Sequence, residues 1–171
     1  MHMKLKKYEI QLAKLIAFIL IILTLLEINA FTASGATRKS IANLFIRYNP
    51  KLTREQAILF SKTVFQASAK YHVSPALIAA IIVCESSARP RVISKTGDYG
   101  LMQIHYKVHK DKVSKRSDLF NPRINIFLGT RIFAQYRKGR TLHGALTRYS
   151  GGSKSYARKV IRTLRNIERR R

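Results

Sequence analysis

Acidic residues and cysteine are both scarce in this sequence. Only 8 Asp and Glu stand against 33 Lys and Arg among 171 residues, which gives a formal net charge of +25 at pH 7. Such an excess indicates polyanionic surroundings, such as nucleic acid, an anionic lipid surface or an acidic polymer. The single cysteine, Cys84, excludes an internal disulfide, so the fold must rest on its core. A hydrophobic content of 46% excludes a chain that is disordered by composition.

Patterns that bind metals are missing as well. The sequence has no pair of cysteines and no His-Glu-x-x-His motif. His105 and His109 are spaced i, i+4, but the neighbouring Lys107 and Lys110 would repel a cation. The sequence therefore predicts neither a metal site nor a cofactor.

No apolar run reaches the roughly 20 residues that a membrane-spanning helix usually needs. The run Leu15 to Leu26 follows a segment with four lysines, and Ser34-Gly35-Ala36 has the small-x-small form of a cleavage site. This order predicts a signal for export over residues 1–36 and a periplasmic or other extracytoplasmic location. Retention as an inner-membrane anchor is the alternative, because the run could extend weakly through Phe31. Export argues against nucleic acid as a partner and favours an anionic wall polymer or membrane surface.

The rest of the chain shows no alternating strand pattern and no internal repeat, which predicts a mainly α fold. We expect a linker over residues 37–51 and one domain over residues 52–171. Capping and proline signals predict helices over about 53–70, from Pro75 to about Ser87, from Pro122 to near Gly139, from Thr141 to about Tyr149, and from Ser153 or Ser155 onward. The stretch from Arg89 to Asp118 has no clear period, and a loop of that length is usually functional.

Glu85 carries the most chemical information. It ends the apolar run from Ile78 to Cys84, so its carboxyl group should sit half out of water. Desolvation disfavours the charged form, and its pKa should rise toward the range of a general acid. The glycine-hinged segment from Gly97 to Ile104 could fold over this carboxyl group, and Tyr149 adds an aromatic hydroxyl beside a flexible turn. The pattern indicates an enzyme with one carboxyl group at the centre of its chemistry.

Four motifs in order resemble the lysozyme-like lytic transglycosylases, which cleave the glycan strands of peptidoglycan. The resemblance covers about residues 52–167 and rests on Glu85-Ser86, Gly100-Leu101-Met102-Gln103, Asn121-Pro122 with Asn125-Ile126 and Gly129, and Tyr149-Ser150-Gly151-Gly152 with Tyr156. It implies a lysozyme-like catalytic domain with a long active-site loop. The chain departs from the family at Ser150, where asparagine is usual. A serine side chain is shorter than an amide side chain and has one polar function fewer, so substrate contacts at this position are the ones affected.

The resemblance also implies a reaction and a set of contacts. Glu85 would protonate the oxygen between N-acetylmuramic acid and N-acetylglucosamine, then act as base on the muramic C6 hydroxyl. That hydroxyl closes a 1,6-anhydro ring, and an internal nucleophile gains a large effective molarity. The implied substrate contacts are Ser86, Met102, Gln103, Tyr149, Ser150 and Tyr156.

Two other functions stay open at this point. Asp98, if it faced the cleft, could position a water molecule and make the enzyme a lysozyme-type hydrolase; a turn residue that holds the loop is the interpretation we favour. A non-catalytic basic module that binds wall polymer, lipid or nucleic acid is the third reading. Small exported enzymes of the resembling type often serve a secretion or conjugation apparatus, which is therefore an expected partner beside peptidoglycan.

Overall fold

A computed structural model describes residues 14–19 and 37–169. The chain divides into two units, residues 1–35 and 36–171, which we treat separately. Residues 14–19 of the first unit are helical. Within the described part of the chain, no helix is both long and apolar enough to cross a membrane. Most of the predicted export signal and its cleavage site lie outside the described residues, so both stay predictions.

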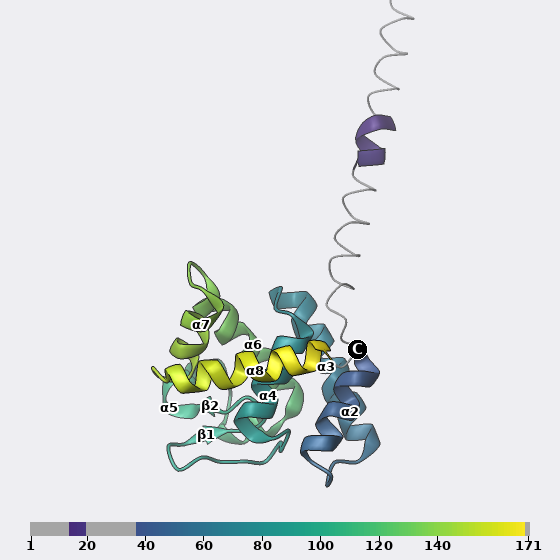
Figure 1. Ribbon diagram of the computed structural model, residues 1–171. Coiled ribbons are helices and arrows are strands. Elements are labelled where there is room, and N and C mark those ends of the chain that lie inside the picture. The colour runs from purple at the N-terminus through teal and green to yellow at the C-terminus, as the bar shows by residue number, and fades with distance from the viewer. Residues whose placement is uncertain (1–13, 20–36, 170–171) are drawn as a thin grey trace, which may run out of the picture. The chain divides into compact units, whose positions relative to one another are not determined.

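The second unit is built mainly from helices, which confirms the predicted fold class (Figure 1). Helix α4 (Pro75–Ser86) is buried at every position from Pro75 to Val83 and packs against its neighbours α2, α3 and α8. An all-round apolar helix of this kind belongs in the centre of a fold. The other long helices are α2 (Arg38–Tyr48), α3 (Arg54–Tyr71), α6 (Pro122–Arg137), α7 (Leu142–Tyr149) and α8 (Lys154–Arg169).

The helix starts agree with the capping signals. Thr53 forms a capping box with Gln56 and begins α3, as predicted. The side chain of Asn121 accepts hydrogen bonds from the backbone at the start of α6, and Thr141 does the same for α7. These caps satisfy backbone N–H groups that have no partner inside the helix. The five predicted helices are therefore confirmed, with ends that differ by one or two residues.

The predicted linker over residues 37–51 is wrong, because it contains α2. Thr37 and Ser40 form a capping box at its start. Ile41, Ala42, Leu44 and Phe45 are buried, and the ring of Phe45 meets that of Phe60 edge to face at 6.4 Å. The basic residues beside this short apolar stripe obscured the helical pattern in the sequence. The unit that carries the site therefore includes α2 in its core.

The segment between α4 and α6 holds more structure than the sequence indicated. Strand β1 (Asp98–Tyr99) pairs antiparallel with β2 (Ile104–His105), and short helical turns follow: α5 (Tyr106–His109), η1 (Lys110–Lys112) and η2 (Arg116–Phe120). Gly100 starts the turn of this hairpin with φ +76, and a Cβ there would lie 2.3 Å from the Leu119 carbonyl oxygen. Only glycine fits both constraints. The turn of the hairpin thereby lies close against η2 and the first part of α6.

Candidate active site

Glu85 lies in the last turn of α4 and is half-buried. Tyr156 of α8 donates a hydrogen bond of 2.6 Å to its Oε1. Burial raises the pKa of Glu85 to about 7, and the charge of Asp98 adds to the rise. The hydrogen bond from Tyr156 and the charge of Lys159 act against it without cancelling it. Because desolvation dominates, about half of the Glu85 side chains carry a proton at pH 7, as a general acid requires.

Glu85 faces a groove of ≈ 530 Å³. The walls come from α4, the β1–β2 hairpin and its flanking loop, α5, the end of α6, α7 and α8. A groove of this size suits an extended polar ligand that lies across the carboxyl group. Of the site residues predicted from the sequence, it brings together Glu85, Gln103, Tyr149, Ser150 and Tyr156.

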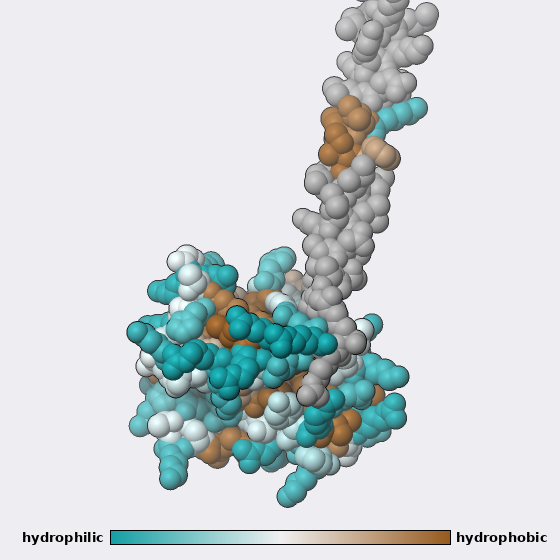
Figure 2. Space-filling view, in the orientation of Figure 1, coloured by the Kyte–Doolittle hydropathy of each residue, from teal (hydrophilic) through white to brown (hydrophobic). Residues whose placement is uncertain are grey.

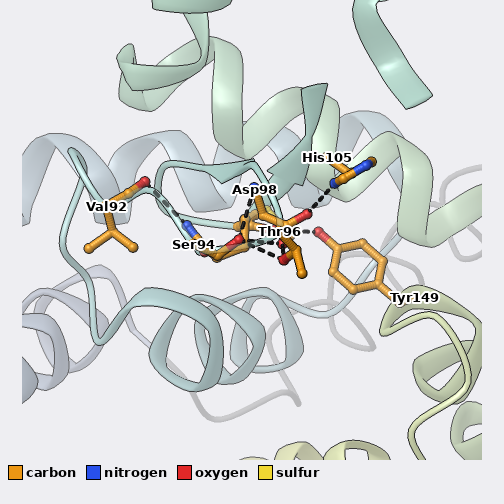
Figure 3. A network of polar contacts seen from close by, with 8 residues as sticks. Val92, Ser94, Thr96, Asp98, His105 and Tyr149 are labelled. Atoms are coloured by element: carbon orange, nitrogen blue, oxygen red, sulfur yellow. Dashed lines mark hydrogen bonds and ion pairs between the residues drawn. The ribbon is translucent and has the colours of Figure 1, made fainter. Parts of the chain in front are cut away.

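Asp98 also lines this groove, on the hairpin side, but both of its oxygens are occupied (Figure 3). Oδ2 accepts hydrogen bonds from the hydroxyls of Ser94 and Thr96, each at 2.6 Å. Oδ1 lies 2.8 Å from Nδ1 of His105. Burial alone would raise the pKa of Asp98, but these three hydrogen bonds outweigh it and the pKa is lowered. Asp98 is therefore an ionised residue that ties the loop to β2, the turn-holding role favoured from the sequence.

Tyr149 and Gln103 line the groove, and each also donates a hydrogen bond to the backbone of the hairpin turn. The Tyr149 hydroxyl donates to the Met102 carbonyl oxygen at 2.9 Å, and Figure 3 shows its ring pointing toward the Asp98 network. Burial, followed by the charge of Glu85, raises the pKa of Tyr149 well above 10, so this phenol stays neutral. Gln103 has a left-handed backbone with φ 47, and its Nε2 donates to the Gly100 carbonyl oxygen at 2.9 Å. That bond leaves the Oε1 side of the amide for a donor on a ligand.

Ser86 and Met102, both predicted to touch the substrate, lie behind the groove. Ser86 is 1% exposed, and its hydroxyl is bonded to the carbonyl oxygens of Leu101 at 2.8 Å and Ile82 at 3.1 Å. Met102 is 0% exposed and lies against Gly129, where an added Cβ would come within 2.6 Å of its sulfur. Their adjacency in sequence to Glu85 and Gln103 explains the wrong expectation. Both position the site from the core: Ser86 fastens α4 to the hairpin, and Met102 seats the hairpin on α6.

Ser150 lines the groove, yet its hydroxyl is used within the turn between α7 and α8. It lies 3.1 Å from the Thr147 carbonyl oxygen and accepts a bond from the backbone N–H of Ser153 at 3.1 Å. A serine hydroxyl has one proton to donate, so this engagement limits what it can offer a sugar. The departure from asparagine thus places Ser150 in a turn-holding role beside Gly151 and Gly152, which have φ +71 and φ +117.

The groove is also lined by residues that the sequence did not assign to it, among them His105, His109, Tyr136 and Arg148. The two histidines drew attention only for their i, i+4 spacing, and Arg148 and Tyr136 lie in helices whose surface positions carry no motif. Their convergence depends on how α5, α6 and α7 pack, which spacing does not reveal. Within the described residues, no cluster of three His, Cys, Asp or Glu side chains is arranged to hold a metal ion.

Comparison with known proteins agrees with this geometry. Residues 62–168 match the family described as the Transglycosylase SLT domain. The Endo-type membrane-bound lytic murein transglycosylase A of Klebsiella pneumoniae is 33% identical over 101 residues, 54% of this chain and 50% of that protein. A Transglycosylase of Enterobacteria phage PRD1 is 31% identical over 119 residues, 63% of this chain and 44% of that protein.

A third relative extends the match farther along the chain. The Membrane-bound lytic murein transglycosylase C of Cronobacter sakazakii is 33% identical over 136 residues, 69% of this chain and 38% of that protein. The chain thus spans half or less of the length of these relatives. The family match alone covers well over half of the chain and includes Glu85, the hairpin and Tyr156. This chain belongs to the Transglycosylase SLT domain family.

Proposed function

We propose that the protein is a peptidoglycan lytic transglycosylase that uses Glu85 first as general acid and then as general base. The observation that carries this proposal is a single protonatable carboxyl group, with its pKa raised to about 7, at the wall of an open groove. Family membership and relatives named as lytic murein transglycosylases support it. The bond cleaved is the β-1,4 bond between N-acetylmuramic acid and N-acetylglucosamine.

In the first step Glu85 gives its proton to the glycosidic oxygen. Tyr156 donates to Oε1 at 2.6 Å, which leaves Oε2 as the atom that carries the proton. When the proton leaves, Tyr156 stabilises the carboxylate that forms, and Lys159 adds a favourable charge. The leaving sugar departs with a new hydroxyl group, and positive charge develops at the anomeric carbon of the muramic residue. General acid catalysis of this kind contributes about 10²–10⁴-fold.

In the second step the Glu85 carboxylate takes the proton of the C6 hydroxyl of the same muramic residue. The C6 oxygen attacks the anomeric carbon and closes the 1,6-anhydro ring, so Glu85 regains its proton and no water is consumed. One carboxyl group suffices because the nucleophile is internal, with an effective molarity on the order of 10⁵ M or more. Asp98 is held by Ser94, Thr96 and His105 and is not required to supply a second base.

A lysozyme-type hydrolase is the second candidate, because Asp98 lines the same groove as Glu85. Hydrolysis needs a second group that activates water or bonds the sugar. The hydrogen bonds to both Asp98 oxygens stabilise its ionised form and lower its basicity, which favours the transglycosylase. A non-catalytic basic module is the third, and the raised pKa of Glu85 in a groove argues against it.

The inferred location and partners rest on the net positive charge and on the basic and apolar N-terminal segment. We infer export by the segment over residues 1–36, with a cleaved signal or an inner-membrane anchor as its two forms. Basic residues are exposed along the outer face of α8, where Figure 2 shows a hydrophilic band. They suit an anionic wall polymer or membrane surface. We infer a secretion or conjugation apparatus as a further partner, as the family resemblance implies.

The test is release of glycan fragments from purified peptidoglycan by the whole chain, followed by mass spectrometry of the products. The proposal expects fragments that end in 1,6-anhydro-muramic acid, and a loss of at least about 10²-fold in Glu85→Gln. Glu55→Gln is the matched control, because Glu55 is exposed in the first turn of α3 and lies outside the groove. Equal activity in Glu85→Gln and the parent chain would refute the proposed chemistry.

A further inference from the structure

Arg148 contributes a positive charge to the groove that the proposed reaction does not use. It lies in the last turn of α7, one residue before Tyr149, and its side chain is exposed. Its guanidinium carbon lies 5.6 Å from the centre of the Tyr136 ring, and both residues line the groove of Glu85. A guanidinium over an aromatic face is held by cation–π attraction and keeps its hydrogen-bond donors free at the edge.

No acidic side chain in the described part of the chain neutralises Arg148. The ion pairs found there join His105 to Asp98 and Lys112 to Asp111. Asp98 already accepts three hydrogen bonds, from its own loop and from β2. Glu85 is partly protonated near neutral pH. The guanidinium therefore faces the groove as an uncompensated cation, next to the place where a glycan strand would lie.

His109 adds a second unused polar group to the same groove. Its Nδ1 is buried and has no hydrogen-bond partner among the described residues. Burial, followed by the charge of Lys112, lowers the pKa of His109, so its ring is neutral at pH 7. A buried nitrogen without a partner is uncommon in folded proteins and suits a site that a ligand completes. Arg148 and His109 thus provide hydrogen-bonding groups in the groove that the proposed reaction at Glu85 does not use.

We propose that Arg148, supported by Tyr136, binds a carboxylate on the substituent of the muramic residue and so makes the enzyme selective for charged strands. This inference rests on the proposed function. The sugar rings of the strand are neutral. In an intact strand the lactyl carboxyl of muramic acid forms the amide bond to the stem peptide, so the free carboxylates are those of the stem peptide. Arginine matches a carboxylate with two parallel N–H bonds, which gives both strength and orientation.

The test compares cleavage of three substrates: intact strands with stem peptides, strands stripped of peptide so that the lactyl carboxylate is free, and intact strands whose carboxylates are converted to amides. Arg148→Gln should lower kcat/KM on intact strands about tenfold, mostly through KM, because one charge-assisted contact is lost. On amidated strands the variant and the parent chain should behave alike. On stripped strands the lactyl carboxylate is the carboxylate that remains: a loss there as well would show that Arg148 also accepts this group, and no loss there assigns the contact to the stem peptide alone.

Arg131→Gln is the control, since Arg131 is exposed on α6, lies outside the groove and carries the same charge. It should leave kcat/KM unchanged on all three substrates. Arg148→Lys should recover part of the loss, because it restores charge without the bidentate geometry. An equal loss for Arg148→Gln on intact and amidated strands, or no loss on either, would overturn the proposal.

A binding measurement separates this inference from the proposed function. In a Glu85→Gln background, which keeps the strand uncleaved, the added Arg148→Gln change should weaken binding of intact soluble strands about tenfold and leave binding of amidated strands unaltered. Preferential binding of intact over amidated strands, without any cleavage by the parent chain, would contradict the proposed reaction and leave the role of Arg148 intact. Cleavage by the parent chain without a difference in binding would sink the role of Arg148 alone.

Discussion

At the scale of single residues, the site depends on the pKa of Glu85, which is set by two opposing effects: burial and the hydrogen bond from one tyrosine. Burial raises its pKa, and the hydrogen bond from Tyr156 opposes the rise. A group held near its pKa at neutral pH can both give and take a proton, as the two proposed steps require.

Tyr156→Phe should raise the pKa of Glu85 further, because the hydrogen bond that stabilises the carboxylate is lost. The acid form is the active one in the first step, so the rate of the parent chain should fall as pH rises through about 7. In the variant the descending part of the pH–rate profile, its alkaline limb, should move to higher pH. The maximal rate at low pH should drop about tenfold. The pH dependence of kcat/KM measures both effects.

Tyr149→Phe is the comparison for that experiment. The Tyr149 hydroxyl bonds to the Met102 carbonyl oxygen and not to Glu85. Its removal can lower the rate but should leave the alkaline limb where the parent chain has it. An alkaline limb that moves equally in both variants would show that the Tyr156 hydrogen bond does not specifically lower the pKa of Glu85.

Glu85→Gln should stabilise the fold at alkaline pH. The folded pKa of about 7 exceeds the value of 4.5 for an unperturbed glutamate, so the folded state binds more protons than the unfolded state between these values. Stability is therefore lost as pH rises through this window, by roughly 3 kcal/mol. Urea unfolding at pH 4 and pH 8 checks this. The free energy of unfolding of the variant should exceed that of the parent chain at pH 8 and not at pH 4. An equal difference at both pH values would contradict the raised pKa.

At the scale of elements, Asn125 of α6 fastens the loop that carries the site. It is 1% exposed; its Nδ2 donates to the carbonyl oxygens of Tyr99 and Leu119, each at 2.8 Å, and its Oδ1 accepts from the Met102 backbone at 2.7 Å. One side chain thereby joins both arms of the hairpin turn to α6. Ser86 joins the same hairpin to the end of α4, so the hairpin is fixed both to α6 and to α4.

Asn125→Ala should lower the free energy of unfolding by about 2–4 kcal/mol, because three backbone groups lose their buried partner. Activity should fall as well, since the hairpin wall loosens. Asn166→Ala is the control: Asn166 is exposed on α8, and a change there should stay within about 0.5 kcal/mol. Urea unfolding of both variants provides the comparison. A cost for Asn125→Ala no larger than that of Asn166→Ala would remove its fastening role.

The sequence predicted helices better than it predicted the site. Thr53, Asn121 and Thr141 are local signals, so the helix starts follow from neighbours in the chain. The central place of Glu85 was also accessible, because an apolar helix that ends in a carboxylate is a local pattern. The roles of Ser86 and Met102 were not, since both depend on partners far along the chain. Arg148 came to the groove only through the packing of α7 beside α6.

At the scale of the whole molecule, part of the excess positive charge forms a row along one helix. Arg158, Arg162, Arg165 and Arg169 recur at helical spacing along α8 and are exposed, while Ala157 and Val160 on its other face are buried. In Figure 2 the band of hydrophilic residues along this helix is plain. A row of cations of this kind can lie along an anionic surface.

Replacing these four arginines by glutamine should weaken binding to vesicles rich in anionic phospholipid, by about 1 kcal/mol for each charge that lies near the surface. Added salt should weaken binding of the parent chain in the same direction. A control with four lysines exposed on other elements replaced by glutamine, at Lys51, Lys95, Lys107 and Lys138, has the same net charge. Vesicle sedimentation compares them. Equal binding by the two sets would assign the attraction to net charge and not to α8.

The most direct test of the account is cleavage of peptidoglycan in water labelled with heavy oxygen. Ring closure by the muramic C6 hydroxyl takes no oxygen from the solvent, so the new muramic ends should carry no label and should be lighter than reducing ends by one water. Mass spectrometry reads both properties in a single product. Label on the muramic ends would show that water attacks the anomeric carbon, and it would contradict a mechanism in which Glu85 alone serves as acid and base.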